Sequence, residues 1–165
     1  MKKALAVVLL MILVMCGCGK KNDFELKTKN ISFVAEVSYY NENYSFKTKI
    51  DAKGNMSATV IKPDSFKDLT FDFSKGKTTA EFMGISYVPQ NGKLPANNAA
   101  KVIYEAMIDV SSNKDVDEKD GKNFVAEGKI DNRKYVFVFS PAGFPLSLEL
   151  TDEGYKAVFN NLTVE

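Results

Sequence analysis

From Ile31 onward, apolar and polar residues alternate with a period of two, the pattern of a β-strand with one buried face. The first run places Phe33, Ala35, Val37 and Tyr39 on one face. Further alternating runs follow at residues 44–51, 56–62, 69–73, 78–83, 85–88, 123–130, 134–139, 145–150 and 154–164. Turn residues separate the runs, and the first hairpin loop is expected at Asn41-Glu42-Asn43. Short strands at this spacing predict about nine antiparallel strands joined in a meander.

One segment, Asn97 to Ser112, follows the helical period instead. Its apolar residues fall on one stripe, which contains Ala100, Ile103, Met107 and Val110, with Val102 and Ala106 beside it. Asn97 or Asn98 is the predicted N-cap. The charged residues 113–122 that follow are expected to form a solvated loop.

A single sheet with one apolar face must curl over another element to bury that face. The helix is the only other substantial apolar element after residue 30. The expected fold class is therefore α+β: a strongly curved antiparallel sheet, an incomplete barrel of about nine strands, wrapped around one central amphipathic helix.

Two C-terminal motifs carry a family resemblance. A Gly143-Phe144-Pro145 turn opens the strand that runs to Leu150, and the last strand contains the phrase Phe159-Asn160-Asn161-Leu162. Together with the order of elements from residue 31 to 164, these motifs resemble the bacterial lipoprotein-carrier proteins of the LolA/LolB and LppX/LprG-like group. That resemblance implies an incomplete β-barrel around an apolar cavity that binds an acyl chain, as a lipid or lipoprotein ligand. The family usually opens with a helix, and residues 23–30 do not predict one.

The candidate lining of such a cavity consists of apolar side chains from the sheet and from the inner stripe of the helix. They are Phe46, Ile50, Phe71, Phe73, Phe82, Ile103, Met107, Phe137 and Phe139. The competing interpretation is that they simply fill a close-packed core, in which aromatic residues are ordinary. A cavity requires the sheet to curl more widely than one helix can fill.

The first eighteen residues have the parts of an export signal. Lys2 and Lys3 precede an uncharged apolar run from residue 4 to 15, which is too short to span a bilayer comfortably as a helix. The following Met15-Cys16-Gly17-Cys18 resembles the lipobox of bacterial lipoproteins, in which a diacylglycerol is attached to the cysteine and the signal is cut just before it. On that resemblance Cys18 is the lipidated residue.

Cys16 is the rival lipidation site, but the bulky Met15 precedes it where a small residue is expected. An ordinary secretory signal is the other alternative, although no cysteine follows Cys18 to form a disulfide. The expected division is a signal peptide at 1–17, a lipidated tether at 18–30 and one domain at 31–165. The chain is then expected at the extracytoplasmic face of the cell membrane, with the membrane as partner through the N-terminal lipid anchor.

Composition removes most catalytic chemistry. The chain has no histidine, and it has neither a cysteine after Cys18 nor a nucleotide-binding or nucleophile-elbow motif. The acidic run from Asp115 fails the EF-hand pattern, with Lys119, Asp120 and Ala126 at the required oxygen, glycine and glutamate positions. A net charge of +1 gives no basic surface for nucleic acid. We therefore expect a non-enzyme without cofactor or metal that binds a lipid or other apolar ligand between sheet and helix; the alternative is an interaction or sensor lipoprotein with a fully packed core.

Overall fold

The computed structural model describes residues 25–89, 94–95, 98–112, 116–119 and 122–164. They form an 11-stranded sheet, one α-helix and one short 3-10 helix. In chain order the elements are β1 (Ile31–Tyr39), β2 (Glu42–Ile50), β3 (Met56–Lys62), η1 (Asp64–Phe66), β4 (Thr70–Ser74), β5 (Lys77–Phe82), β6 (Ile85–Tyr87), α2 (Ala99–Ser112), β7 (Asp117–Lys119), β8 (Asn123–Ile130), β9 (Arg133–Phe139), β10 (Pro145–Leu150) and β11 (Tyr155–Val164).

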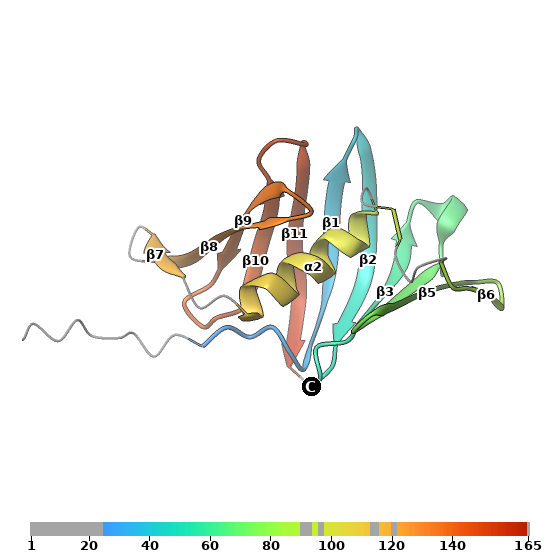
Figure 1. Cartoon of the computed structure of the whole chain (residues 1–165), viewed down its shortest axis with the longest axis horizontal. Helices are drawn as coiled ribbons and strands as arrows, with labels where there is room; N and C mark the ends of the chain where they lie inside the picture. Colours follow the sequence, from blue (N-terminus) through green and yellow to red (C-terminus); the bar gives the residue numbers. More distant parts are fainter. Residues whose placement is uncertain (1–24, 90–93, 96–97, 113–115, 120–121, 165) are drawn as a thin grey trace, which may run out of the picture.

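The sheet consists of two meanders joined through its middle. The strand order is β6-β5-β4-β3-β2-β1-β11-β10-β9-β8-β7, and every pairing is antiparallel. The first and last long strands, β1 and β11, pair from Ile31↔Val164 to Ser38↔Lys156. The sheet is open, with β6 and β7 at its two edges, and it curves around α2 (Figure 1). The expected fold class, a curved antiparallel sheet around one amphipathic helix, is confirmed.

This topology explains why α2 crosses the face of the sheet. The chain leaves the sheet at one edge, β6, and re-enters it at the opposite edge, β7, so the segment between them has to traverse the full width. Figure 1 shows α2 lying diagonally over the central strands. The predicted stripe faces inward, because Ala100, Ile103 and Val110 are all buried. The backbone N–H of Lys101 donates to Asn98 Oδ1 at 2.9 Å, which identifies Asn98 as the N-cap.

The number of strands, the structure of the charged run at 113–122 and the position of the first hairpin turn differ from the sequence predictions. The sheet has eleven strands rather than about nine, partly because the charged run expected to be a loop contributes β7, which pairs with β8. The first hairpin turns at Tyr40 and Asn41, not at 41–43. Both turn residues have positive φ values, of 50° and 64°, as a two-residue type I′ turn requires. The last pair of this hairpin is Tyr39↔Glu42. The alternation of apolar and polar residues does not show where the pairing ends, so it could not locate the turn.

The buried core found among the described residues runs from Ile31 to Phe159, so a chain that begins at Lys20 contains all of it. Before β1, residues 25–28 are not helical, as expected, and the Lys27 N–H donates to the Gly143 carbonyl at 2.8 Å. A Cβ at Gly143, whose φ is +83°, would overlap the Glu25 carbonyl, so glycine is required where this N-terminal segment crosses the β9–β10 turn. The predicted signal peptide and Cys18 lie outside the described residues.

Candidate apolar binding surface

Seven of the nine residues predicted to line a cavity lie on the helix-facing side of the sheet, and the other two, Ile103 and Met107, lie on α2. Of the nine, seven are buried: Phe46, Ile50, Phe73, Ile103, Met107, Phe137 and Phe139. Phe71 and Phe82 are partly exposed. The sequence therefore predicted which strand positions face the helix, and the predicted residues divide into a covered group and an open group.

The covered group is tightly packed. Phe137 and Phe139 each have 0% exposed area, so neither ring touches bulk water or a water-sized void. The Phe137 ring stacks on Phe139 at a centroid distance of 4.5 Å and on Phe159 at 5.7 Å. At the other side of the helix, Tyr104 of α2 stacks on Phe73 of β4 at 5.0 Å. Each of these rings is therefore packed against other side chains of the described residues.

Two tyrosines tie α2 to the C-terminal half of the sheet. The buried Tyr155 hydroxyl on β11 donates to the Ala99 carbonyl at 3.0 Å, and the Tyr135 hydroxyl on β9 donates to Asp109 Oδ2 at 2.7 Å. Burial raises the pKa of both hydroxyls above the usual tyrosine value, and the Asp109 hydrogen bond adds to the shift of the Tyr135 pKa. Gly128 makes the second contact possible, because a Cβ there would lie 2.5 Å from the Tyr135 hydroxyl oxygen.

A network of charged side chains also holds α2 to the C-terminal half of the sheet. Lys101 Nζ on α2 lies 3.0 Å from Asp131 Oδ2 in the β8–β9 turn and 3.2 Å from Glu105 Oε1. Arg133, the single arginine of the chain, lies 3.5 Å from Glu153 Oε2 and within 3.9 Å of Glu105. These charges span α2 and the β8–β9 and β10–β11 turns, so they position the helix against β8–β11.

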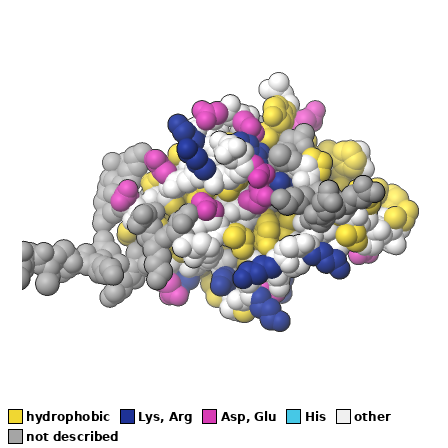
Figure 2. Space-filling view, viewed as in Figure 1, with side chains coloured by type: hydrophobic (Ala, Val, Ile, Leu, Met, Phe, Trp, Pro, Cys, Tyr) yellow, Lys and Arg dark blue, Asp and Glu magenta, His cyan; other side chains and the backbone are white. Residues whose placement is uncertain are grey.

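The open group, Phe71 on β4 and Phe82 on β5, is extended beyond the helix by Ile85 and Tyr87 on β6. The pairings Phe71↔Ala80 and Ala80↔Tyr87 place Tyr87 on the helix-facing side, and Phe82↔Ile85 does the same for Ile85. Ile85 is 74% exposed and Tyr87 is 59% exposed. Figure 2 shows hydrophobic side chains gathered at this end of the molecule. The apolar face of the sheet therefore continues past the element that covers its centre.

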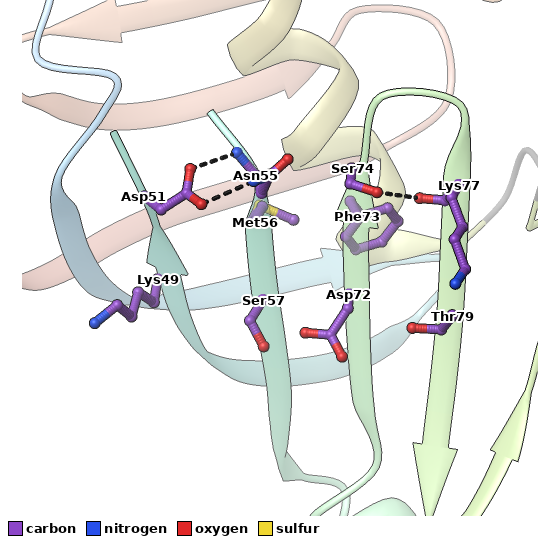
Figure 3. A pocket seen from close by; sticks show the side chains of 10 residues that line it. All are labelled: Lys49, Asp51, Asn55, Met56, Ser57, Asp72, Phe73, Ser74, Lys77 and Thr79. Carbon is purple, nitrogen blue, oxygen red and sulfur yellow. Dashed lines mark hydrogen bonds between the residues drawn. The ribbon is translucent and has the colours of Figure 1, made fainter. Parts of the chain in front are cut away.

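A separate pocket of about 420 Å³, most of whose lining residues are polar, lies at the end of β2–β5 near the β2–β3 turn (Figure 3). Asp51 is fixed there, because its carboxylate accepts hydrogen bonds from the Asn55 side chain at 2.8 Å and the Asn55 backbone N–H at 2.9 Å. The bond from the Asn55 side chain is the main cause that lowers the pKa of Asp51. Of the nine predicted residues this pocket includes only Phe73, so it does not coincide with the apolar surface.

Neither a metal-binding cluster nor a membrane-crossing helix is present among the described residues. No group of three or more His, Cys, Asp or Glu side chains within it is arranged to hold a metal ion. Within the same residues, no helix combines the length and apolar character needed to cross a bilayer.

Comparisons with known proteins assign no family to this chain. The sequence matches no family model and no curated protein. Among solved structures, it is similar to a LolA superfamily protein from Nitrosomonas europaea, at 8% sequence identity and a TM-score of 0.43. The match covers 86% of this chain and 89% of that one. LolA is the family that the C-terminal motifs resemble, but at this identity and TM-score the likeness assigns neither a family nor a function.

Sequence reasoning missed the features that depend on cross-strand pairing. The alternation predicts a strand at 85–88, and nothing in its local pattern distinguishes an edge strand beyond the helix from a covered one. The links from Tyr135 to Asp109 and from Tyr155 to Ala99 join residues 26 and 56 positions apart. A tyrosine at an inward strand position was the only available signal, since a buried phenol needs a hydrogen-bond partner.

Proposed function

We propose that this protein is a membrane-anchored extracytoplasmic lipoprotein that binds a lipid or another apolar ligand on the helix-facing side of its sheet. The observation that carries the binding proposal is the apolar face continuing beyond α2 to Ile85 and Tyr87, at 74% and 59% exposure. Burying large apolar side chains such as these lowers the free energy, and that gain is missing while they are exposed to water. A surface on which several of them lie together is therefore suited to binding an apolar partner.

The anchor proposal rests on the N-terminal sequence. Gly17-Cys18 follows an uncharged apolar run behind Lys2 and Lys3, as in a lipobox. Each buried CH₂ of an attached chain contributes about 0.8 kcal/mol, and two or more chains hold a protein stably at a membrane.

Metabolic labelling with palmitate tests the anchor. The wild type should incorporate label and fractionate with membranes, whereas Cys18→Ser should do neither. Cys16→Ser is the matched control, since it changes the neighbouring thiol and should keep both properties. A Cys18→Ser variant that is still labelled and membrane-bound would refute Cys18 as the lipidation site.

Lipid extraction and a direct binding assay test the ligand. The protein from Lys20 onward is purified, extracted for mass spectrometry and titrated with the polyene fatty acid parinaric acid, whose fluorescence rises in apolar surroundings. The wild type should carry lipid or bind the probe, and Tyr87→Ser should weaken binding. Val158→Lys is the control, because Val158 is 40% exposed on the opposite face of the sheet. Lipid-free protein that fails to bind the probe would count against an apolar ligand.

A second candidate function is an interaction or sensor lipoprotein whose core stays fully packed. It is favoured by the 0% exposure of Ile103, Phe137 and Phe139 beneath the helix. Under this alternative, partners dock on loops or on a sheet edge such as β6, and no lipid copurifies. The extraction and titration above separate the two candidates directly.

A further inference from the structure

Thr48 is a polar residue in an apolar setting. It lies on the helix-facing side of β2 and has 0% exposed area, and its hydroxyl oxygen has no hydrogen-bond partner among the residues that the structure describes. Its neighbours across the strands are the buried Phe33 on β1 and Ala58 on β3. A buried hydroxyl without a partner destabilises the folded state, and valine would fill the same space without that loss. The hydroxyl therefore needs an explanation other than packing.

Thr48 is also the inner end of a row that leads to the open surface. Successive pairings align Thr48 with Ala58, Ala58 with Phe71, Phe71 with Ala80, and Ala80 with Tyr87. Exposure increases along this row, from 0% at Thr48 and Ala58 to 59% at Tyr87. The row crosses four strand intervals, roughly 19 Å in all, which is comparable with a long extended acyl chain.

The polar contacts that hold α2 on the sheet lie away from this row. The hydrogen bonds from Tyr155 and Tyr135 and the ion pair to Asp131 hold α2 toward β8–β11. Toward β4, α2 presents the Tyr104 ring stacked on Phe73, a contact that can slide or separate without breaking a hydrogen bond. A movement that lifts α2 from β2–β4, while its contacts to β8–β11 are kept, would uncover Thr48 from the side of the open surface.

We propose that Thr48 is the polar recognition point for the ligand, which lies along the row from Tyr87 inward and accepts a hydrogen bond from the Thr48 hydroxyl through an uncharged oxygen. This inference rests on the proposed lipid-binding function and narrows its ligand class to neutral lipids, such as esters or alcohols. A carboxylate is disfavoured because burying it beside Thr48 would require a cation. The lysines that flank Thr48 on β2, Lys47 and Lys49, point to the opposite, exposed side of the sheet.

Three fluorescent probes test this assignment on the protein from Lys20 onward: methyl parinarate, which has a neutral ester, ionised parinaric acid, and diphenylhexatriene, a hydrocarbon. The wild type should bind the ester more tightly than the carboxylate. Thr48→Val should weaken ester binding about tenfold, which is about 1.4 kcal/mol, and leave diphenylhexatriene binding unchanged. The same variant should raise the thermal midpoint by about 3 °C, because it removes the unpaired hydroxyl.

Matched variants separate the outcomes. Thr48→Ser retains a hydroxyl and should keep ester binding, and Thr59→Val, on the other face of the sheet, should not change it. Ala80→Leu fills the row at a partly exposed position and should weaken ester and hydrocarbon binding alike. Thr48→Val protein that binds the ester as tightly as the wild type would overturn the role of Thr48 and leave the lipid-binding function standing. Wild-type protein that binds none of the probes would overturn both.

Discussion

Replacing Phe137 by alanine measures how tightly the region between sheet and helix is packed. The Phe137 side chain has 0% exposed area and lies against Phe139 and Phe159, with ring centroids at 4.5 Å and 5.7 Å. Removing a fully buried phenyl ring costs its transfer free energy plus a penalty for the cavity left behind, about 3–5 kcal/mol together. Since the total stability of a domain is about 5–15 kcal/mol, the loss should be large but measurable.

Urea denaturation followed by circular dichroism is the assay, since the chain has no tryptophan. With an m-value of about 2 kcal/mol/M, the unfolding midpoint should fall by roughly 2 M. Phe71→Ala is the control, because that ring is partly exposed on the open surface and its loss should cost roughly 1–2 kcal/mol. Phe137→Leu retains a large apolar side chain and should give an intermediate loss if the alanine variant does not fold.

The size of the loss distinguishes a filled interior from a hollow one. A Phe137→Ala loss below about 1.5 kcal/mol would refute the packed arrangement, because a ring that borders an existing cavity has fewer contacts to lose. It would also favour a ligand cavity beneath the helix over binding that requires α2 to move.

Three further outcomes follow from named contacts. Gly128→Ala should destabilise the fold by about 1–3 kcal/mol in urea unfolding, because its Cβ would displace the Tyr135 hydroxyl from Asp109; an unchanged midpoint would contradict the close approach. Asn98→Ala should cost about 1 kcal/mol through loss of the N-cap bond, with a matching loss of midpoint and no change in m-value. The raised pKa of Tyr155 means that folding favours its protonated form, so stability is fully present below about pH 10, the usual tyrosine pKa, and declines as the pH rises above it. Urea unfolding midpoints measured from pH 8.5 to 11 should fall less steeply with pH in Tyr155→Phe than in the wild type. An identical slope in the variant would show that Tyr155 ionises as readily in the folded protein as in the unfolded protein.

Alternation and helical period were sufficient to predict most of the architecture. Inward positions such as Phe33, Phe46 and Tyr155 are buried, and the stripe that contains Ile103 faces the sheet. These predictions hold because the side chains on one strand face, or on one helix stripe, are determined by the local backbone geometry. For the same reason, the helix-facing side of the sheet could be identified as the candidate site.

The division of that site into covered and open halves required the strand order and the path of α2. Phe71 and Phe137 occupy equivalent inward strand positions in the sequence pattern, yet Phe137 is buried beneath α2 whereas Phe71 is partly exposed beyond it. Likewise, Thr48 fits the alternation as an ordinary strand residue, and its unpaired hydroxyl becomes evident only when its neighbours on β1 and β3 are known. Local sequence specifies which face of an element is apolar, but which part of that face is covered depends on contacts between residues far apart in the chain, and these arise only when the whole sheet assembles.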